Sequence, residues 1–581
     1  MRGEYLKTVE GRLKFMGVFV LAIGGLLFWR MFDIQVLKHD HYLAMAQDQQ
    51  RFEKVQTAQR GKILVHDSNV DDSVYYPLAM DVKSFAVWAV PRQIKEKDKV
   101  STELASLLSI DGKELFSKID NDKMYIPPLK RGLSFDDAAK VKAKAIGGIL
   151  VIPEYSRNYP EGSLASQVLG FVNKEGEGKY GFEGHYNDEL KGKEGNLVGE
   201  KDTIGRIISL LSQKEPQNGT SYVLSIDRSV QYFVEQKLAK AITDYQADSG
   251  TVVIMDVKTG GILAMASLPT FDPNNYQTQA NTDTSLFMNP AIAGTFEPGS
   301  IFKPVIMSIA MDKGLVTPET EETFGESVEV QGFTIHTAEG KAFGKETMTQ
   351  VLEHSDNVGM VWLTSKMANL DLYNSIKSFG FLDRTGIDLD SEVPGYTLPI
   401  KNWQDINRAT VSFGQGIAVT PIELVSAYAA IANNGKYLVP HIVDRIVHPD
   451  GSFTQIGKEE GKQVISEQVS AQMKQMLYNV VINGTAKKAK VPGFKISAKT
   501  GTAQIAKPEG GYEDNDAKLG IFNHTAAGFA PSDNPEYAML VKLTRPKTFQ
   551  YAESTAVPLF GEISNFLLNF HYRTTPTEPI E

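Results

Sequence analysis

The first hydrophobic pattern along the chain is an uncharged apolar run at residues 15–29, FMGVFVLAIGGLLFW. At about 1.5 Å per residue this run is somewhat short for a hydrocarbon core of ~30 Å. The following MFDIQVL lengthens it, and Arg30 and Asp33 must then reach the far interface or pair near it. The pattern predicts a single membrane-spanning helix over residues 15–36.

Two other interpretations of this run stay open. A cleaved signal peptide needs a small-residue cleavage site, and the nearest A-x-A, at residues 44–46, lies far beyond the run. A buried helix of a soluble domain is disfavoured by the terminal position and by a basic flank. That flank consists of Arg2, Lys7, Arg12 and Lys14. Because basic residues precede the run and few follow it, we expect residues 1–14 in the cytoplasm and the chain after Leu37 outside the membrane.

Later patterns predict alternating helices and hairpins. After Asp227, a candidate cap, SVQYFVEQKLAKAITDY has helical apolar spacing. TVVIMDV and GILAMAS, joined through KTG, predict a β-hairpin. In TPIELVSAYAAIANNG, Thr420 and Glu423 form a capping box, Pro421 takes the first helical position and Gly435 lies past the end. Helices interspersed with hairpins favour an α+β fold with an antiparallel sheet.

The chain of 581 residues is too long for one core and predicts two to four units at ~150 residues each. Short strand-like runs and charged loops fill the region up to the polar stretch EPQNGTS, Glu215–Ser221, which is a plausible boundary. We therefore expect one domain over residues 37–220 and another over residues 221–570. The last residues, 571–581, are predicted to be disordered.

Composition excludes several classes of function. The net charge of −10 without a long basic run argues against a nucleic-acid partner. The absence of cysteine removes disulfides, thiolate nucleophiles and Cys-based zinc sites. The sequence contains no His-Glu-x-x-His, Gly-x-Ser-x-Gly or P-loop motif, which argues against other hydrolases and nucleotide use. No metal or cofactor is expected.

The stretch EPGSIFKP, Glu297–Pro304, places a serine and a lysine three positions apart. Helical apolar spacing in the following residues predicts a helix that begins after Pro-Gly, with Ser300 near its N-terminus and Lys303 one turn on. A serine nucleophile needs a base, and lysine can serve if burial or a neighbouring cation keeps it neutral. A free N–H at the helix start suits a developing oxyanion. Because Ser-x-x-Lys should arise by chance roughly twice in such a chain, this motif taken alone favours a structural role over a catalytic one.

Two more short motifs follow in order, Ser-Asp-Asn at Ser355–Asn357 and Lys-Thr-Gly-Thr at Lys499–Thr502. Each has a structural alternative, because Ser-Asp-Asn often forms a turn or cap and Lys-Thr-Gly a hairpin tip. Another Lys-Thr-Gly, Lys258–Gly260, joins the two runs of the predicted hairpin and precedes Ser300, so it does not fit the order. Ser-x-x-Lys, Ser-Asp-Asn and Lys-Thr-Gly, in this order, are the signature set of penicillin-recognising serine acyltransferases.

On these motifs the chain resembles the class B penicillin-binding proteins, from the apolar run to about residue 570. Stretches similar to the family's pedestal motifs are AQRGKIL, RNYPEGSLASQVLGFVN and GFEGHYNDELKGKEG. Stretches similar to its catalytic domain are SGTVVIMDVKTGGILAMAS, SFGQGIAVTPIEL and HTAAGFAPSDNPEYAM. SFGQGIAVTP and AVPLFGEI most resemble the septal, cell-division transpeptidase. One departure is VHDSNVDDSVYYPLA, where the family usually has an Asp-Arg-Asn-Gly turn, and it leaves the local pedestal geometry open.

The resemblance implies an extracytoplasmic pedestal of the dimerisation type over residues 37–220. Residues 221–570 would form a transpeptidase domain similar to serine β-lactamases. The implied activity is that of a peptidoglycan D,D-transpeptidase. Ser300 would attack the penultimate D-Ala carbonyl of a stem peptide, and an amine of a neighbouring stem would take the acyl group from the acyl-enzyme. β-Lactam antibiotics would acylate the same serine.

The resemblance also assigns roles to single residues. Lys303 would deprotonate Ser300, Ser355 would relay protons toward the leaving group, and Asn357 would bond the substrate backbone and Lys303. His354 would be a spectator. The remaining residues would bind substrate, and they are Lys499, Thr500, Gly501 and Thr502.

Within that set, Lys499 would favour the neutral form of Lys303 by like-charge repulsion and attract the substrate carboxylate. The hydroxyls of Thr500 and Thr502 would bind that carboxylate. The backbone N–H groups of Ser300 and Thr502 would form the oxyanion hole. Gly501 would leave room for an extended peptide beside the nucleophile.

The implied location is the bacterial cytoplasmic (inner) membrane, with a single span and most of the chain on the outer, periplasmic side. Implied partners are the division or elongation machinery and a glycosyltransferase. Alternatives are an elongation-type class B transpeptidase, a D,D-carboxypeptidase or β-lactamase, and an inactive scaffold of the division complex. A β-lactam sensor is disfavoured, because fourteen residues before the run are too few for a signalling region.

Overall fold

The computed structural model divides the chain into two compact units. One unit is Met1–Ala58 with Gly192–Asn218, and the other is Gln59–Lys191 with Gly219–Glu581. The predicted disordered tail falls outside the described residues from residue 577 onward. The structure describes residues 2–70, 74–123, 126–201, 207–338, 340–456, 460–505, 507, 511–512 and 519–576.

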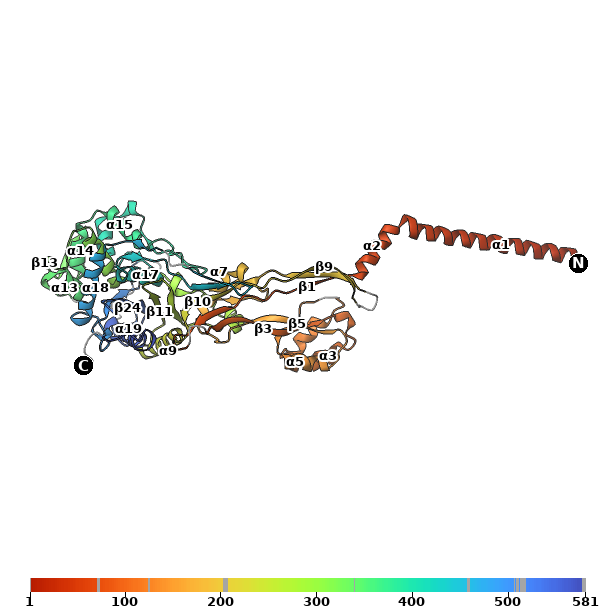
Figure 1. The fold of residues 1–581 in the computed structure, drawn as a ribbon, viewed down its shortest axis with the longest axis horizontal. Helices are drawn as coiled ribbons and strands as arrows, with labels where there is room; N and C mark the ends of the chain where they lie inside the picture. The colour runs from red at the N-terminus through yellow and green to blue at the C-terminus, as the bar shows by residue number, and fades with distance from the viewer. Residues whose placement is uncertain are drawn as a thin grey trace. The chain divides into compact units, whose positions relative to one another are not determined.

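The first unit begins with the helix that carries the apolar run. Helix α1, Arg2–Phe32, continues through a π-turn, Asp33–Leu37, to α2, His39–Gln50 (Figure 1). By length and composition, Val9–Leu37 could span a membrane, with a mean hydropathy of 1.9. Asp33 pairs with Arg30 at 2.9 Å and with Lys38 at 3.1 Å, so the carboxylate at the end of this segment is paired with basic groups on both sides. A three-stranded antiparallel sheet completes the unit: β1 Arg51–Gln56, β8 Gly195–Lys201 and β9 Ile207–Lys214.

A seven-stranded sheet in the second unit joins segments from both expected domains. Strand β10, Ser221–Asp227, runs parallel to β2, Ile63–His66, and antiparallel to β20, Val443–Val447. Strand β10, which begins at the expected boundary, therefore pairs with one strand from each of the two expected domains. The other strands are β3 Tyr76–Ala89, β4 Lys130–Leu133, β5 Ile149–Asn158 and β21 Phe453–Gln455.

A buried ion cluster ties the three pedestal-like stretches together. Glu183 is fully buried and accepts from Arg60 Nε at 2.7 Å and from Arg157 Nε at 2.6 Å. Arg157 Nη1 also donates to the carbonyl of Gly61 at 2.8 Å. Each of these charges has an oppositely charged partner, and this pairing offsets part of the cost of burying them. It connects residues from AQRGKIL, RNYPEG and GFEGHYN at one point.

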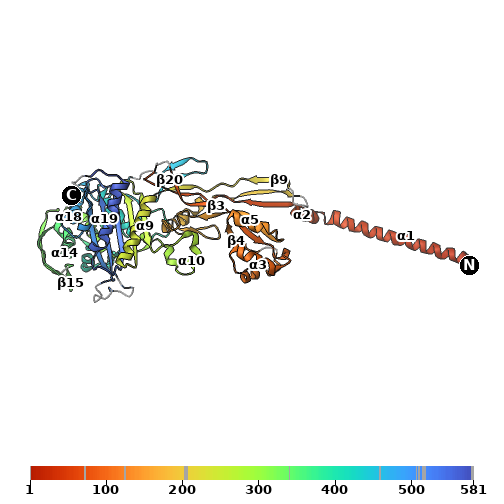
Figure 2. The same ribbon diagram turned by 90° about the horizontal axis from the view of Figure 1, so that it is seen from below.

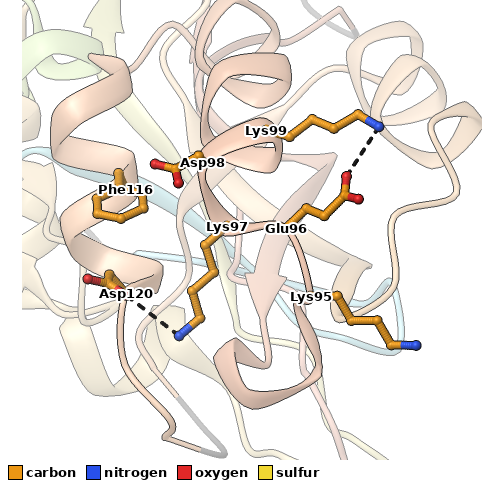
Figure 3. Close-up of a pocket in the computed structure, with 7 residues that line it drawn as sticks. All are labelled: Lys95, Glu96, Lys97, Asp98, Lys99, Phe116 and Asp120. Atoms are coloured by element: carbon orange, nitrogen blue, oxygen red, sulfur yellow. Dashed lines mark ion pairs between the residues drawn. The ribbon is translucent and has the colours of Figure 1, made fainter.

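Three helices cover one part of β3, β4 and β5 with a small apolar core of their own: α3 Lys97–Leu108, α4 Gly112–Ile119 and α5 Phe135–Ala143. A cavity of about 440 Å³ opens beside α3 and α4 (Figure 3). Lys97 contacts Asp120 at 3.7 Å there, and Lys99 contacts Glu96 at 3.2 Å. None of the predicted site residues lines this charged cavity.

The segment that departs from the family pattern packs on the start of α9, Arg228–Tyr245. Ser229 Oγ donates to Asp67 at 2.8 Å, and Ser68 N donates to Asp227 at 2.7 Å. Residues 71–73 lie outside the described part. The described residues of this segment are thus tied to the helix that opens the second expected domain.

A five-stranded antiparallel sheet forms the centre of the second unit, in the order β12-β11-β25-β24-β23. Helix α9 and α19, Ala556–Phe566, lie side by side against it (Figures 1 and 2). Helix α17, Pro421–Ala432, is buried along its whole length and packs on β11, β24 and β25. The strands are β11 Ser249–Asp256, β12 Ile262–Leu268, β23 Ser497–Gln504, β24 Phe522–Ala530 and β25 Tyr537–Thr544.

The local predictions in this unit are confirmed. Asp227 caps α9 by accepting from Val230 N at 2.9 Å. The hairpin forms as β11 and β12, and its Lys-Thr-Gly is a turn held by Asp256, which accepts from Thr259 N at 2.7 Å. The capping box of Thr420 and Glu423 is present at the start of α17. The mixture of helices with an antiparallel sheet is the α+β architecture that was expected.

Candidate active site

The segment with Ser300 enters its helix through a tight turn. Residues Gly299–Phe302 form a 3-10 turn, and the α-helix α12, Lys303–Asp312, starts only after it. Gly299 has a φ of +59°, and a Cβ there would lie 2.9 Å from Ala503 Cβ. Both facts require glycine. The predicted helix therefore exists, but with Ser300 in the turn before its regular part.

Lys303 is fully buried, and its amine is surrounded by the Ser-Asp-Asn motif. Its Nζ lies 2.6 Å from Ser355 O, 2.8 Å from Asn357 Oδ1 and 3.2 Å from Ser355 Oγ. Burial first, and then the charge of Lys499, hold the pKa of Lys303 well below its ordinary value. A neutral amine has two hydrogens and one lone pair. The two carbonyl oxygens can take both hydrogens, which leaves the lone pair for a hydroxyl proton.

Ser355 lies between the two lysines. Lys499 Nζ donates to Ser355 Oγ at 2.9 Å and to Thr500 O at 3.2 Å. Burial lowers the pKa of Lys499 to about 7. Ser355 adopts a φ of +57°, in the left-handed region that is costly for a residue with a side chain. This strained turn places the Ser355 hydroxyl between the amines of Lys303 and Lys499.

The Ser300 hydroxyl forms no hydrogen bond with Lys303 among the described residues, because the Lys303 amine is directed at Ser355 and Asn357. Ser300 itself is half-buried. Catalytic hydrogen bonds are often absent without substrate and tighten when it binds. The free hydroxyl is therefore available to a ligand on the open side of the site.

Strand β23, at the edge of the five-stranded sheet, passes directly beside the turn that holds Ser300. A Cβ at Gly501 would lie 2.4 Å from Thr525 Oγ1 and 3.1 Å from both Pro298 O and Ile301 Cγ2. Only glycine fits this approach. The close packing of β23 on Pro298 and Ile301, which flank the Gly299–Ser300 pair, brings the first and third motifs together.

The two threonines of the third motif have partners outside the predicted set. Thr500 Oγ1 lies 2.8 Å from Thr485 Oγ1, and Thr502 Oγ1 accepts from Ala552 N at 3.1 Å. Thr485 was not singled out from the sequence. It belongs to a short polar turn after a helix, and nothing in that pattern distinguishes it from an ordinary loop. Only the folded chain places it beside Thr500.

Asn357 and Asp356 have different structural roles within the second motif. Asn357 Nδ2 donates to the carbonyl of His336 at 3.0 Å, so the amide links Lys303 to the hairpin of β14, Ser327–Val330, and β15, Phe333–His336. Asp356 caps α14, Asn357–Ser365, because it accepts from Val358 N and Gly359 N. The Ser-Asp-Asn motif therefore contains both a helix cap and the residues that were predicted to act in catalysis.

Another contact missed by sequence reasoning lies just before the nucleophile. Glu297 accepts from Gly416 N at 2.9 Å and from Tyr512 Oη at 3.0 Å. It therefore anchors the turn before Ser300 to two distant segments. Among the described residues, no group of three or more His, Cys, Asp or Glu side chains could hold a metal ion.

Two family models match the chain. Residues 250–565 match the penicillin binding protein transpeptidase domain, and residues 55–224 match the penicillin-binding protein dimerisation domain. Among curated proteins, stage V sporulation protein D of Bacillus subtilis is 32% identical over 96% of this chain and 85% of its own length. The peptidoglycan D,D-transpeptidase FtsI of Escherichia coli is 30% identical over 99% of this chain and 94% of its own length.

Solved structures agree with these sequence matches. A peptidoglycan synthetase from Bifidobacterium adolescentis has a TM-score of 0.72 and 28% identity, over 91% of this chain and 98% of that one. Penicillin binding protein 3 of Mycobacterium tuberculosis, complexed with aztreonam, has a TM-score of 0.69 and 28% identity, over 91% and 99%. Both domains and nearly the full length are therefore matched. The chain belongs to the class B penicillin-binding proteins, and within them to the septal type.

Proposed function

We propose that this chain is a serine-type peptidoglycan D,D-transpeptidase of septal wall synthesis. Ser300 Oγ attacks the penultimate D-Ala carbonyl of a stem peptide while neutral Lys303 takes the hydroxyl proton. The peptide C–N bond then breaks, and Ser355 passes a proton to the departing D-Ala amine. An amine of a neighbouring stem attacks the resulting ester, Ser300 recovers its proton, and the cross-link forms. β-Lactams acylate the same serine.

The observation that carries the proposal is the position of the Ser355 hydroxyl, 2.9 Å from Lys499 Nζ and 3.2 Å from Lys303 Nζ. A hydroxyl in this position can accept a proton from one lysine amine and donate its own proton toward the other. Burial favours the neutral form of Lys303, which is what a base toward serine needs near neutral pH.

Substrate binding is assigned to the edge strand. An extended stem peptide can pair with β23, whose outer edge has no neighbouring strand in the described sheet. Lys499 and the hydroxyls of Thr500 and Thr502 bind its carboxylate. The N–H groups of Ser300 and Thr502 stabilise the oxyanion. Gly501 keeps the strand close to the nucleophile turn.

We propose a single-pass location in the bacterial cytoplasmic membrane, with the catalytic domain on the outer side. The span Val9–Leu37 and the basic residues before its apolar part support this orientation. We also propose that proteins of the division machinery, including a glycosyltransferase, bind the chain there. Protease protection in spheroplasts tests the orientation, because only the extreme N-terminus should be shielded.

The decisive experiment incubates the full chain in detergent with a stem peptide and an acceptor amine. We expect a cross-linked dimer together with free D-Ala, and neither from a Ser300→Ala variant. Ser365→Ala, which removes an exposed hydroxyl on α14, is the matched control and should keep full activity. Free D-Ala with shortened peptide and no cross-link would identify a carboxypeptidase instead.

A further inference from the structure

A buried carboxyl that the proposed mechanism does not use lies behind the Ser-Asp-Asn turn. Glu346 is 2% exposed and belongs to β16, Gly344–Thr347, which pairs with β13, Glu321–Phe324. Its Oε1 lies 2.5 Å from His354 Nδ1. Its Oε2 is buried and receives no hydrogen bond from the described residues. Because a buried oxygen without a donor is costly, this atom is better accounted for as one that carries a proton itself.

Asp356 is the neighbour that can accept this proton. It is fully buried, and its Oδ1 and Oδ2 each accept one backbone N–H at the start of α14. Each carboxylate oxygen still has a free lone pair. Burial raises the pKa of Glu346, the contact with His354 opposes that rise, and the neighbouring carboxyl of Asp356 adds to it. Two adjacent buried carboxyls avoid ionising together, which favours a single proton on the Glu346 side of the pair.

We propose that Glu346 is a positioning residue for the acyl-transfer centre. In its neutral form its Oε2–H donates to Asp356, while its Oε1 accepts from His354 Nδ1–H. This chain of hydrogen bonds fixes Asp356, which in turn holds the strained Ser355 on one side and Asn357 on the other. This role of Glu346 rests on the proposed function, because Glu346 acts on acyl transfer only through Ser355 and Asn357, the two residues of the turn that bond Lys303.

The neutral form matters because Lys303 must also be neutral. The charges of Asp356 and Glu346 both act to raise the pKa of Lys303, against the larger effect of burial. A second ionised carboxylate at Glu346 would therefore favour the protonated, inactive amine. A protonated Glu346 supplies the hydrogen bond that Asp356 needs without adding this charge.

Titratable and charged groups on several neighbouring segments surround Glu346. His354 follows α13, Met348–Glu353, and is 40% exposed, with its ring stacked on Phe343 at 4.7 Å. The chain of hydrogen bonds thus begins at the surface and ends at a buried cap. Glu322 lies directly opposite Glu346 in the β13–β16 register. Other charged groups that the structure describes on the elements around it are Glu353 on α13, Asp356, Lys303, and the pair of Lys345 with Glu321 on the two strands.

The test compares Glu346→Gln with Glu346→Leu in the full chain. The readout is acylation of Ser300 by a fluorescent penicillin across a pH series, resolved into the initial binding constant and the first-order acylation constant. Glutamine is neutral and can donate to Asp356, so we expect a rate within about threefold of wild type and an unmoved midpoint of the acid limb. Leucine cannot donate, so we expect at least about a tenfold slower acylation step with unchanged initial binding.

Other outcomes would overturn the inference. A shift of the acid-limb midpoint to lower pH in Glu346→Gln would mean that Glu346 is ionised in the active protein. Equal losses in both variants, or wild-type kinetics in Glu346→Leu, would also contradict it. If Glu346→Leu fails to fold, the midpoint of Glu346→Gln alone decides. Glu319→Gln, which neutralises an exposed carboxyl before β13, is the matched control and should keep the wild-type profile.

This design separates the two proposals. If the wild-type chain is not acylated at Ser300, the proposed function fails before Glu346 is considered. If the wild type is acylated and both Glu346 variants match it, only the positioning role of Glu346 fails.

Discussion

Lys499 donates a hydrogen bond of 2.9 Å to Ser355, although 144 residues separate the two in the chain. The same hydroxyl lies 3.2 Å from Lys303 Nζ. Burial depresses the pKa of both lysines, that of Lys499 to about 7. Ser355 is therefore the connection through which a proton can pass between two amines whose pKa values burial lowers.

Replacing Lys499 by methionine should shift the pH dependence of acylation. After burial, the charge of Lys499 is the main cause of the low pKa of Lys303. Without it that pKa rises, so Lys303 becomes neutral only at higher pH. We expect the acid-limb midpoint for acylation by a fluorescent penicillin to move upward, and the maximal rate to fall by about 100-fold or more. Lys495→Met, which removes a half-exposed lysine paired with Asp533, is the control. An unmoved midpoint would contradict the electrostatic coupling.

Gly501→Ala should separate β23 from the nucleophile turn. The added Cβ meets Thr525 Oγ1 at 2.4 Å and Pro298 O at 3.1 Å, so the strand must move. We expect a loss of stability of about 1–3 kcal/mol and a large loss of acylation. Thermal unfolding and penicillin labelling measure the two effects. Gly325→Ala, where the nearest atom is 3.7 Å away, should change neither, and wild-type labelling of Gly501→Ala would refute the packing argument.

Glu183→Ala should destabilise the second unit without touching the catalytic motifs. It leaves the guanidinium groups of Arg60 and Arg157 buried without their shared carboxylate. Loss of one partner from a buried ion cluster costs about 3–5 kcal/mol. The unfolding temperature of the full chain should fall accordingly, while exposed Glu175→Ala should leave it unchanged. A stable Glu183→Ala variant would show that the cluster is dispensable.

Glu423 should make stability depend on pH. Burial raises its pKa to about 7 from an ordinary value of 4.5, although four donors contact it. In the unfolded chain the Glu423 carboxyl loses its proton at lower pH than it does in the folded chain. The stabilisation that comes from its raised pKa is therefore complete below about pH 4.5 and is lost as pH rises through about 7. The loss amounts to as much as about 3 kcal/mol.

Urea unfolding of wild type and Glu423→Gln at a series of pH values measures this slope. The glutamine variant has no ionisable group here and should lack the decline between about pH 5 and pH 7. Glu467→Gln, at an exposed position in the first turn of α18, Glu467–Ile482, should retain it. Parallel curves for wild type and Glu423→Gln would contradict the raised pKa.

Short-range features could be predicted from the residues alone. The caps at Asp227 and Thr420, the hairpin around Lys258–Gly260 and the apolar run near the N-terminus all depend on neighbours within a few positions. Such interactions are encoded in any window of the chain that contains them. The three catalytic motifs and their order were also recognisable, because each is short and continuous.

Contacts between distant segments could not be found this way. The pairing of Ser355 with Lys499, of Glu183 with two arginines, and of Thr485 with Thr500 each joins separate pieces of chain. The start of the Ser300 helix is a 3-10 turn, in which Gly299 packs closely against Ala503 of β23. Propensity and periodicity describe neighbours along the chain, whereas burial, charge and the demand that buried polar groups find partners act between whichever segments the folded core brings together.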